Sequence, residues 1–275
     1  MDIIEQSWVA NNTVTPYDIY IKTLYALVRD RLVAKKDIRL AWETEMPPLA
    51  DYQRVAMEQA TRILDNTGGI FIADVVGLGK SYIGLALLKH YNLYKNAYGV
   101  IICPASLVNM WEDLIARHSI WATVVSMGML SQPHFERTLL DNPRFSNAGL
   151  VLIDESHNLR SRDTKRYRAL ELFTANRPTI LLTATPRNTS AWDIYTQIKL
   201  WHPDDQTMLL DPPHPPNLRE FFNRVEPRNG EKGTASVRDL LDKILIRRTR
   251  KHVLDVYGQD DNHGKRYVTV NKIPK

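Results

Sequence analysis

The feature that most constrains this chain is a glycine-containing turn at residues 73–81, which read ADVVGLGKS. The apolar residues in front of it, 68–73, predict a short buried strand, and residues 82–90 behind it predict a helix that is apolar nearly all round. A strand that turns through glycines into a helix gathers backbone N–H groups and the positive end of the helix dipole around one point. This arrangement predicts a phosphate-binding loop. The Lys80 ammonium would reach the outer phosphates and the Ser81 hydroxyl would be available to magnesium.

One position departs from the usual form of such a loop. Asp74 stands where the pattern G-x-x-x-x-G-K-[ST] has its first glycine. Taken alone, the fragment also fits an ordinary turn before a helix. Segments further along the chain must therefore distinguish a phosphate-binding loop from such a turn. The residues expected to contact a nucleotide here are Asp74, Val75, Val76, Gly77, Leu78, Gly79, Lys80 and Ser81.

An apolar run at residues 150–157, LVLIDESH, ends in two acids. Open α/β sheets bind ligands at the carboxyl ends of their strands, so these acids are expected at the mouth of the sheet. We expect Asp154 to hold magnesium through water, and Glu155 to orient and deprotonate an attacking water. The competing interpretation is that the two acids only cap the next helix.

Two further apolar runs end in turn residues, and a third segment carries a glutamine. Residues 179–186, TILLTATP, form an apolar run that closes in hydroxyl residues and a proline. Residues 99–106, GVIICPAS, predict another buried strand, running into a turn and Trp111. Ahead of the loop, Gln53 carries an amide that is suited to reading the edge of adenine.

Together these segments resemble the first RecA-like motor lobe of superfamily-two helicases and translocases. The resemblance is greatest to the Snf-type (switch/sucrose-nonfermenting) DNA-translocating ATPases. That family usually has Asp at the position of Asp74, an Asp-Glu-x-His acidic box, and asparagine at the position of Asn188. Residues 246–253, IRRTRKHV, resemble its Arg-Arg-x-Lys segment, and the resemblance extends from about Leu49 to Val253.

The resemblance implies an ATP hydrolase of the helicase family that uses ATP and Mg²⁺ and moves along double-stranded DNA more than it separates strands. In this family His157, Thr183 and Thr185 would couple the nucleotide state to the nucleic-acid face. That face is expected at Pro104, Ala105 and Ser106, with contacts mostly to phosphates. Such motors complete their site with arginines from a second lobe, and nothing after Val253 resembles one. We therefore expect this chain to bind ATP and to hydrolyse it poorly.

The expected fold is α/β: a RecA-like P-loop NTPase lobe with a mostly parallel sheet flanked by helices, an N-terminal helical extension and a small C-terminal helical addition. The predicted strands lie at about 69–73, 99–103, 122–126, 149–153 and 179–183. The expected divisions are an extension over 1–45, the ATP-binding lobe over 46–203, a helical appendage over 204–257 and a tether toward a second lobe over 258–275.

The charge balance permits a nucleic-acid partner. The net charge is +5, with an isoelectric point near 9.2. Residues 160–168 carry five Lys or Arg against one Asp, and residues 244–275 carry eight against three. Such runs are also common on solvated faces. The partner is expected to be double-stranded DNA, with RNA as the alternative, and the chain is expected to be a monomer.

Other features narrow the class of protein. With one cysteine, Cys103, the chain has no internal disulfide, and that thiol is expected to be buried and inert. The N-terminus lacks the pattern of a secretion signal and no run suits a membrane span, so a cytoplasmic, nucleoid-associated location is expected. The open alternatives are a strand-separating DEAH-type helicase, a non-hydrolysing ATP-binding scaffold, and an unrelated phosphate-loop kinase or GTPase.

Overall fold

The computed structural model describes residues 47–185, 190–227, 232–260, 266–270 and 273–274. By internal contacts the chain divides into two units, residues 1–46 and residues 47–275, and all of the described residues lie in the second unit. The expected N-terminal extension lies outside the described residues, as do Pro186 and Asn188.

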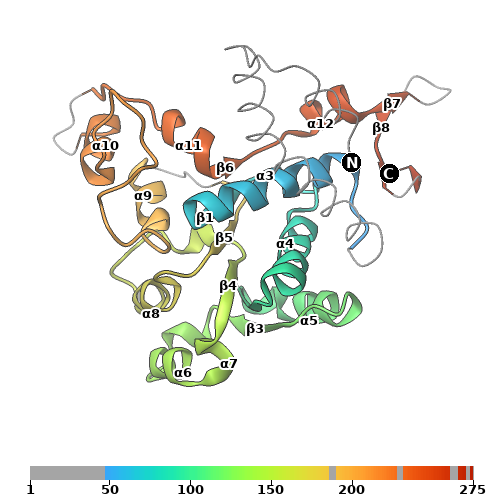
Figure 1. Cartoon of the computed structure of the whole chain (residues 1–275), viewed down its shortest axis with the longest axis horizontal. Coiled ribbons are helices and arrows are strands. Elements are labelled where there is room, and N and C mark those ends of the chain that lie inside the picture. Colours follow the sequence, from blue (N-terminus) through green and yellow to red (C-terminus); the bar gives the residue numbers. More distant parts are fainter. Residues whose placement is uncertain (1–46, 186–189, 228–231, 261–265, 271–272, 275) are drawn as a thin grey trace, which may run out of the picture. The chain divides into compact units, whose positions relative to one another are not determined.

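The centre of this unit is a six-stranded sheet in the order β3-β2-β4-β5-β1-β6, in which every neighbouring pair is parallel (Figure 1). All five strands predicted from the sequence are present, and the sheet gains a sixth. The strands are β1 (Gly69–Ile72), β2 (Tyr98–Cys103), β3 (Ala122–Ser126), β4 (Ala148–Ile153), β5 (Thr179–Leu182) and β6 (Leu245–Ile246).

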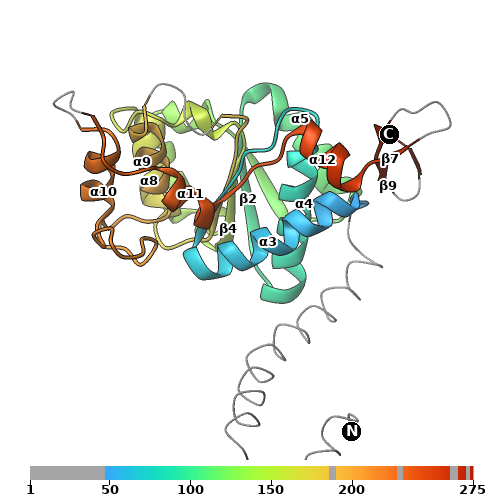
Figure 2. The ribbon, with the colours of Figure 1, turned by 90° about the horizontal axis from the view of Figure 1, so that it is seen from above.

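Helices cover both faces of the sheet, as they must when both faces of a parallel sheet are apolar. In Figure 2, helices α3, α4 and α5 lie on one side of the strands, and α8, α9 and α10 lie on the other. The helices are α3 (Asp51–Thr67), α4 (Lys80–Lys95), α5 (Val108–Arg117), α6 (Phe135–Asp141), α7 (Pro143–Ser146), α8 (Lys165–Thr174), α9 (Trp192–Ile198), α10 (Leu218–Val225), α11 (Arg238–Ile244) and α12 (Arg250–Tyr257). Short 3-10 turns occupy Ala105–Leu107, Met129–Ser131 and Ser156–Asn158.

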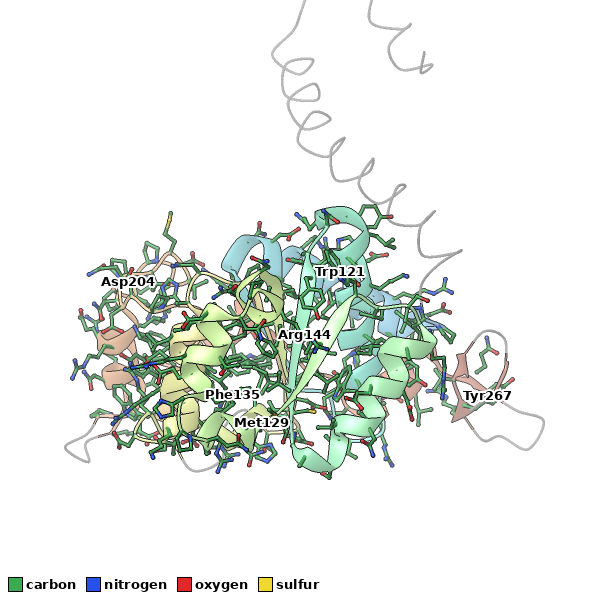
Figure 3. All side chains as sticks on the ribbon, turned by 90° about the horizontal axis from the view of Figure 1, so that it is seen from below. Trp121, Met129, Phe135, Arg144, Asp204 and Tyr267 are labelled. Atoms are coloured by element: carbon green, nitrogen blue, oxygen red, sulfur yellow. The ribbon has the colours of Figure 1, made fainter. Side chains whose placement is uncertain are left out.

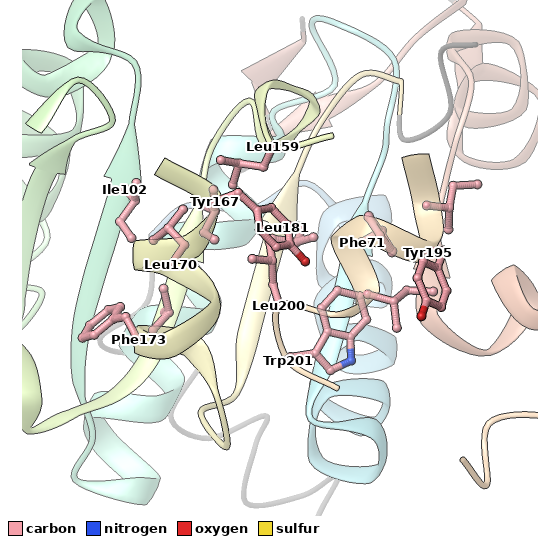
Figure 4. Close-up of a cluster of buried hydrophobic side chains, with 14 of the residues drawn as sticks. Phe71, Ile102, Leu159, Tyr167, Leu170, Phe173, Leu181, Tyr195, Leu200 and Trp201 are labelled. Atoms are coloured by element: carbon pink, nitrogen blue, oxygen red, sulfur yellow. The ribbon is translucent and has the colours of Figure 1, made fainter. Parts of the chain in front are cut away.

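The core follows the alternation of side chains along the strands. On one face, Ile102 and Leu181 share a buried cluster with Tyr167, Leu170 and Phe173 of α8 (Figure 4). In the same cluster Phe71 meets the Trp201 ring edge-on. On the other face, α4 approaches the sheet closely at Gly84. A Cβ atom there would lie 2.7 Å from the Leu152 side chain and 3.2 Å from that of Leu182. Gly84 therefore lets α4, the helix that follows the phosphate loop, pack closely on β4 and β5.

The edge at β3 is protected by side chains rather than by another strand, as is common for sheet edges. The Arg144 Nε donates a hydrogen bond to Thr123 Oγ1 at 3.1 Å, and Tyr98 Oη is hydrogen-bonded to the same hydroxyl. Figure 3 shows Arg144 and Trp121 along this edge. Trp121 is 54% exposed and meets the Tyr98 ring edge-on.

The C-terminal part differs from the expectation in two places. Within the helical appendage expected over 204–257, α11 ends at Ile244 and the next two residues form a strand, β6, which pairs with Phe71 and Ile72. Aliphatic residues beside an open strand edge gain more from pairing and burial there than from another helical half-turn. In the expected tether, β7 (Gln259–Asp260) pairs with β8 (Arg266–Tyr267), and β9 (Thr269–Val270) pairs with β10 (Ile273–Pro274). Among the described residues, no helix is both long and apolar enough to cross a membrane.

Candidate functional site

The predicted phosphate loop leaves the carboxyl end of β1 and enters α4 at Lys80. Gly77 and Gly79 have φ values of 91° and 76°, in the left-handed region where a side chain is strained, so the glycines of the motif are required by the backbone. Within the described residues, Val75 and Leu78 donate backbone hydrogen bonds in the chain, whereas no such bond is made by the amides of Val76, Gly77, Gly79, Lys80 and Ser81. Free amides at the start of a helix of sixteen residues fit an anion.

Lys80 is folded back along this loop. Its ammonium donates a hydrogen bond to the backbone oxygen of Asp74 at 2.8 Å. Lys80 and Ser81 are both partly buried, so their polar groups remain accessible at the mouth of the loop.

The carboxylate of Asp74 faces away from solvent and is held by an arginine from the far end of the chain. Asp74 is fully buried, and its Oδ1 accepts hydrogen bonds from the Arg248 backbone N–H at 2.8 Å and from the Arg248 Nε at 3.1 Å. The other oxygen pairs with a terminal nitrogen of the same guanidinium. Asp74 therefore lies in the loop as expected, with its side chain committed to the protein.

Gln53 lies against the loop on its other side. Its Oε1 accepts from the Ala50 N–H at 2.9 Å and its Nε2 donates to the Leu78 carbonyl at 3.1 Å. The neighbouring Tyr52 hydroxyl donates to the same carbonyl at 3.2 Å. The start of α3 thus supports the loop, and adenine recognition by Gln53 stays a prediction.

The acidic pair follows β4, whose carboxyl end lies on the same edge of the parallel sheet as the phosphate loop. Asp154 is buried; its Oδ2 accepts from the Trp111 indole N–H at 3.0 Å and its Oδ1 from the Glu155 N–H at 2.9 Å. Burial raises the pKa of Asp154, while these hydrogen bonds and the charge of Lys80 act to lower it. Lys80 and Asp154 are therefore close enough to interact electrostatically.

Glu155 has a φ of 51°, which is uncommon for a residue with a side chain. Its Oε2 lies 2.9 Å from Nδ1 of His157, an ion-pair distance without the alignment of a hydrogen bond. Both side chains are about one-third exposed, so the carboxylate remains accessible from solvent.

The remaining predicted residues also lie at this edge of the sheet. Thr183 is fully buried after β5, the strand between β1 and β4, and its Oγ1 accepts from the Thr185 N–H at 3.2 Å. Thr185 is exposed, as are Ala105 and Ser106, while Pro104 is partly buried after β2. The structure brings these segments to one edge, and their coupling and nucleic-acid roles stay predictions.

Cys103, the residue before Pro104, is fully buried, and burial raises the pKa of its thiol to about 12. The thiol therefore stays protonated at neutral pH, as expected of an inert packing residue.

Sequence reasoning missed two residues that shape this site. Arg248 was noted as part of a motif without a partner, and Trp111 was noted only as the end of a segment. No local pattern signals a contact between residues separated by 174 positions, as Asp74 and Arg248 are. A sequence signal for Trp111 would be its amphipathic position in α5, where it is fully buried and its indole N–H needs an acceptor.

Comparison with known proteins supports the resemblance seen in the motifs. Residues 136–270 match the family described as the SNF2-related domain. Over these residues, just under half of its length, the chain is similar to the SNF2-related domain. This confirms the resemblance inferred from the motifs; the matched range holds the acidic box and the Arg248 segment, and the phosphate loop precedes it.

Relatives and solved structures agree with the SNF2 assignment. The chain is 26% identical over 212 residues to the uncharacterized ATP-dependent helicase YqhH of Bacillus subtilis, covering 70% of this chain and 36% of that protein. It is 26% identical over 222 residues to the DNA annealing helicase and endonuclease ZRANB3 of Homo sapiens, covering 70% and 20%. The chain thus spans about a third or less of the length of these relatives.

A solved structure supports the fold. The Sulfolobus solfataricus SWI2/SNF2 ATPase core in complex with dsDNA superposes with a TM-score of 0.58 at 19% identity, covering 75% of this chain and 45% of that one. The six-stranded parallel sheet flanked by helices is accordingly RecA-like, and the α/β class expected from the sequence is confirmed.

Proposed function

We propose that this SNF2-related chain is the ATP-binding lobe of a nucleic-acid-dependent ATPase that moves along double-stranded DNA. The observation that carries the proposal is the meeting of open loop amides, Lys80 and the buried Asp154 at one edge of the sheet. Amides and an ammonium suit phosphate oxygens, and a buried carboxylate that forms no ion pair within the described part of the chain suits a divalent metal. The residues present therefore fit Mg²⁺ with ATP.

In this proposal each residue has a separate task. Lys80 neutralises phosphate charge, Ser81 and Asp154 hold the metal, and Gln53 reads adenine. Glu155 orients the attacking water and takes its proton, and its carboxylate is partly exposed beside His157. Mg²⁺, when bound, neutralises charge that develops on the phosphates.

The proposed coupling runs through the segment between these groups. β5 lies between β1 and β4, so Thr183 and Thr185 stand between the phosphate loop and the acidic pair. His157 adjoins Glu155. A change in nucleotide state would reach Pro104, Ala105 and Ser106 through these neighbours. The names of the relatives, which include a DNA annealing helicase and a core bound to dsDNA, favour DNA over RNA as the partner.

A calorimetric titration of the chain with ATP tests nucleotide binding. We expect saturable one-to-one binding with Mg²⁺ present and much weaker binding with the chelator EDTA, because Asp154 contributes only through the metal. The absence of heat at millimolar ATP would reject the proposal and would favour a scaffold without nucleotide.

A second titration distinguishes the nucleic-acid partners. We expect the chain to bind fluorescent duplex DNA more tightly than duplex RNA of the same sequence, and the affinity to fall steeply with salt because phosphate contacts release counterions. Preference for RNA would favour the strand-separating DEAH-type alternative.

A further inference from the structure

The ion pair between Asp74 and Arg248 joins the phosphate loop to the segment just before α12. Asp74 occupies the first position of the phosphate loop and is fully buried, and Arg248 is 10% exposed. The guanidinium meets the carboxylate side-on with two nitrogens, Nε and one terminal nitrogen, while the Arg248 backbone N–H adds a third donor. A planar fork of this kind fixes direction as well as distance, which a lysine cannot do.

Other contacts hold Arg248 itself in position. Its second terminal nitrogen donates to the Tyr52 carbonyl, and its guanidinium lies 5.2 Å from the centre of the Tyr52 ring. The Tyr52 ring in turn packs near that of Tyr257 in α12, with centroids 6.3 Å apart. Arg248 is therefore oriented independently of any nucleotide.

The same strand-to-helix segment holds the loop at two further points. The Arg248 carbonyl accepts from the Val75 N–H at 3.2 Å, and the Arg250 guanidinium donates to the Val76 carbonyl at 3.1 Å. At the start of α3, the Tyr52 hydroxyl and the Gln53 amide both donate to the Leu78 carbonyl. The loop is thus fixed through two carbonyls, through the Val75 amide and through Asp74, while the amides of Val76, Gly77, Gly79, Lys80 and Ser81 make no backbone hydrogen bond within the described residues.

We propose that Arg248 is a positioning residue of the phosphate loop: its fork on Asp74 sets the loop in the shape that binds phosphate before the nucleotide arrives. This inference rests on the proposed function. Asp74 replaces the flexible first glycine of the usual pattern with an anchored side chain, so the conformational cost of ordering the loop is met on folding rather than on binding.

The test compares three variants of the full chain. Arg248→Lys keeps the buried charge paired but loses the fork, so it is expected to fold. The double change Asp74→Asn with Arg248→Gln removes both charges together and avoids an uncompensated buried carboxylate. Arg177→Lys is the matched control, because Arg177 is a partly buried arginine whose guanidinium holds the Ala148, Phe173 and Ser146 carbonyls elsewhere in the lobe.

Two measurements are made on each variant, at a temperature where it is fully folded. The first is amide hydrogen exchange of residues 74–81 without nucleotide. The second is the affinity for Mg²⁺·ATP by calorimetry. We expect Arg248→Lys to exchange faster in this loop and to bind about tenfold more weakly, since misplacement of supporting groups typically costs 10- to 100-fold. The double variant should show the same two changes, and Arg177→Lys neither.

Unchanged loop exchange in both Arg248→Lys and the double variant would overturn the proposal, as would equal changes in Arg177→Lys. If the wild-type chain binds no nucleotide, the proposed function fails, and the exchange measurement still reports whether Arg248 orders the loop. Faster exchange with unaltered ATP affinity would also count against a positioning role.

Discussion

The residues of the site are held in arrangements that cost free energy without a ligand. Glu155 has a left-handed backbone, and Asp154 is a buried carboxylate. Strained backbones and perturbed pKa values gather at functional sites, so these two neighbours support the proposed role of the acidic box. The same features give predictions at the level of single side chains.

Replacing Lys80 by alanine should weaken Mg²⁺·ATP binding by about 10- to 100-fold, because hydrogen bonds to charged groups contribute about 1.5–3 kcal/mol. Calorimetry measures the change. Lys95→Ala, at the exposed end of the same helix, is the control and should bind ATP as the wild type does, since Lys95 forms a surface ion pair with Asp65 away from the loop. Equal affinities for Lys80→Ala and wild type would remove the lysine from the site.

Asp154 predicts a dependence of stability on pH. Because burial raises its pKa, the folded state binds a proton more tightly than the unfolded state. This carboxyl therefore lowers the free energy of unfolding as pH rises from its ordinary pKa through its raised one. Asp154→Asn removes this pH dependence. The free energy of unfolding of the variant, relative to that of the wild type, should therefore increase as pH rises between these two pKa values. Urea unfolding of both proteins without nucleotide, at a series of pH values, measures this change. A difference in free energy of unfolding that stays constant with pH would contradict the prediction.

At the scale of elements, the site depends on how closely α4 packs on the sheet. Gly84 permits contact with Leu152 and Leu182, the side chains that precede the acidic box and the Thr183 turn. Gly84→Val should lower the free energy of unfolding by about 1–3 kcal/mol through overpacking. Leu93→Val, at an exposed position of the same helix, should change it by less than about 0.5 kcal/mol. Thermal unfolding of both variants would show an equal shift if packing at Gly84 were unimportant.

How much of this the sequence could predict varies between elements. The five strands were predicted because each is a run of aliphatic residues ending in turn residues, and the loop because glycines and Lys80 have a local pattern. β6 was missed because Leu245 and Ile246 continue a helical pattern and become a strand only beside Phe71 and Ile72. The Trp111 bond to Asp154 was missed for the same reason: periodicity shows that a residue is buried, not what it touches.

At the scale of the whole molecule, the proposed function makes the chain one side of a nucleotide site. In related motors a second lobe adds arginines, and such a charge is worth about 10³- to 10⁵-fold in rate. We expect phosphate release from ATP by this chain to be slower than that of an intact motor by about this factor, with or without duplex DNA. Glu155→Gln controls for contaminating ATPases. DNA-stimulated turnover at the rate of an intact motor, abolished in Glu155→Gln, would show that the lobe needs no partner.

The pairing of Asp74 with Arg248 has a consequence for synthesis of the chain on the ribosome. Residues 69–81 emerge early, yet their buried carboxylate has no counter-charge until residue 248 is made. A polypeptide cut after β5 would therefore hold an uncompensated anion in its interior, together with an open strand edge at β1. The smallest fragment that can pair Asp74 must extend at least to Arg248.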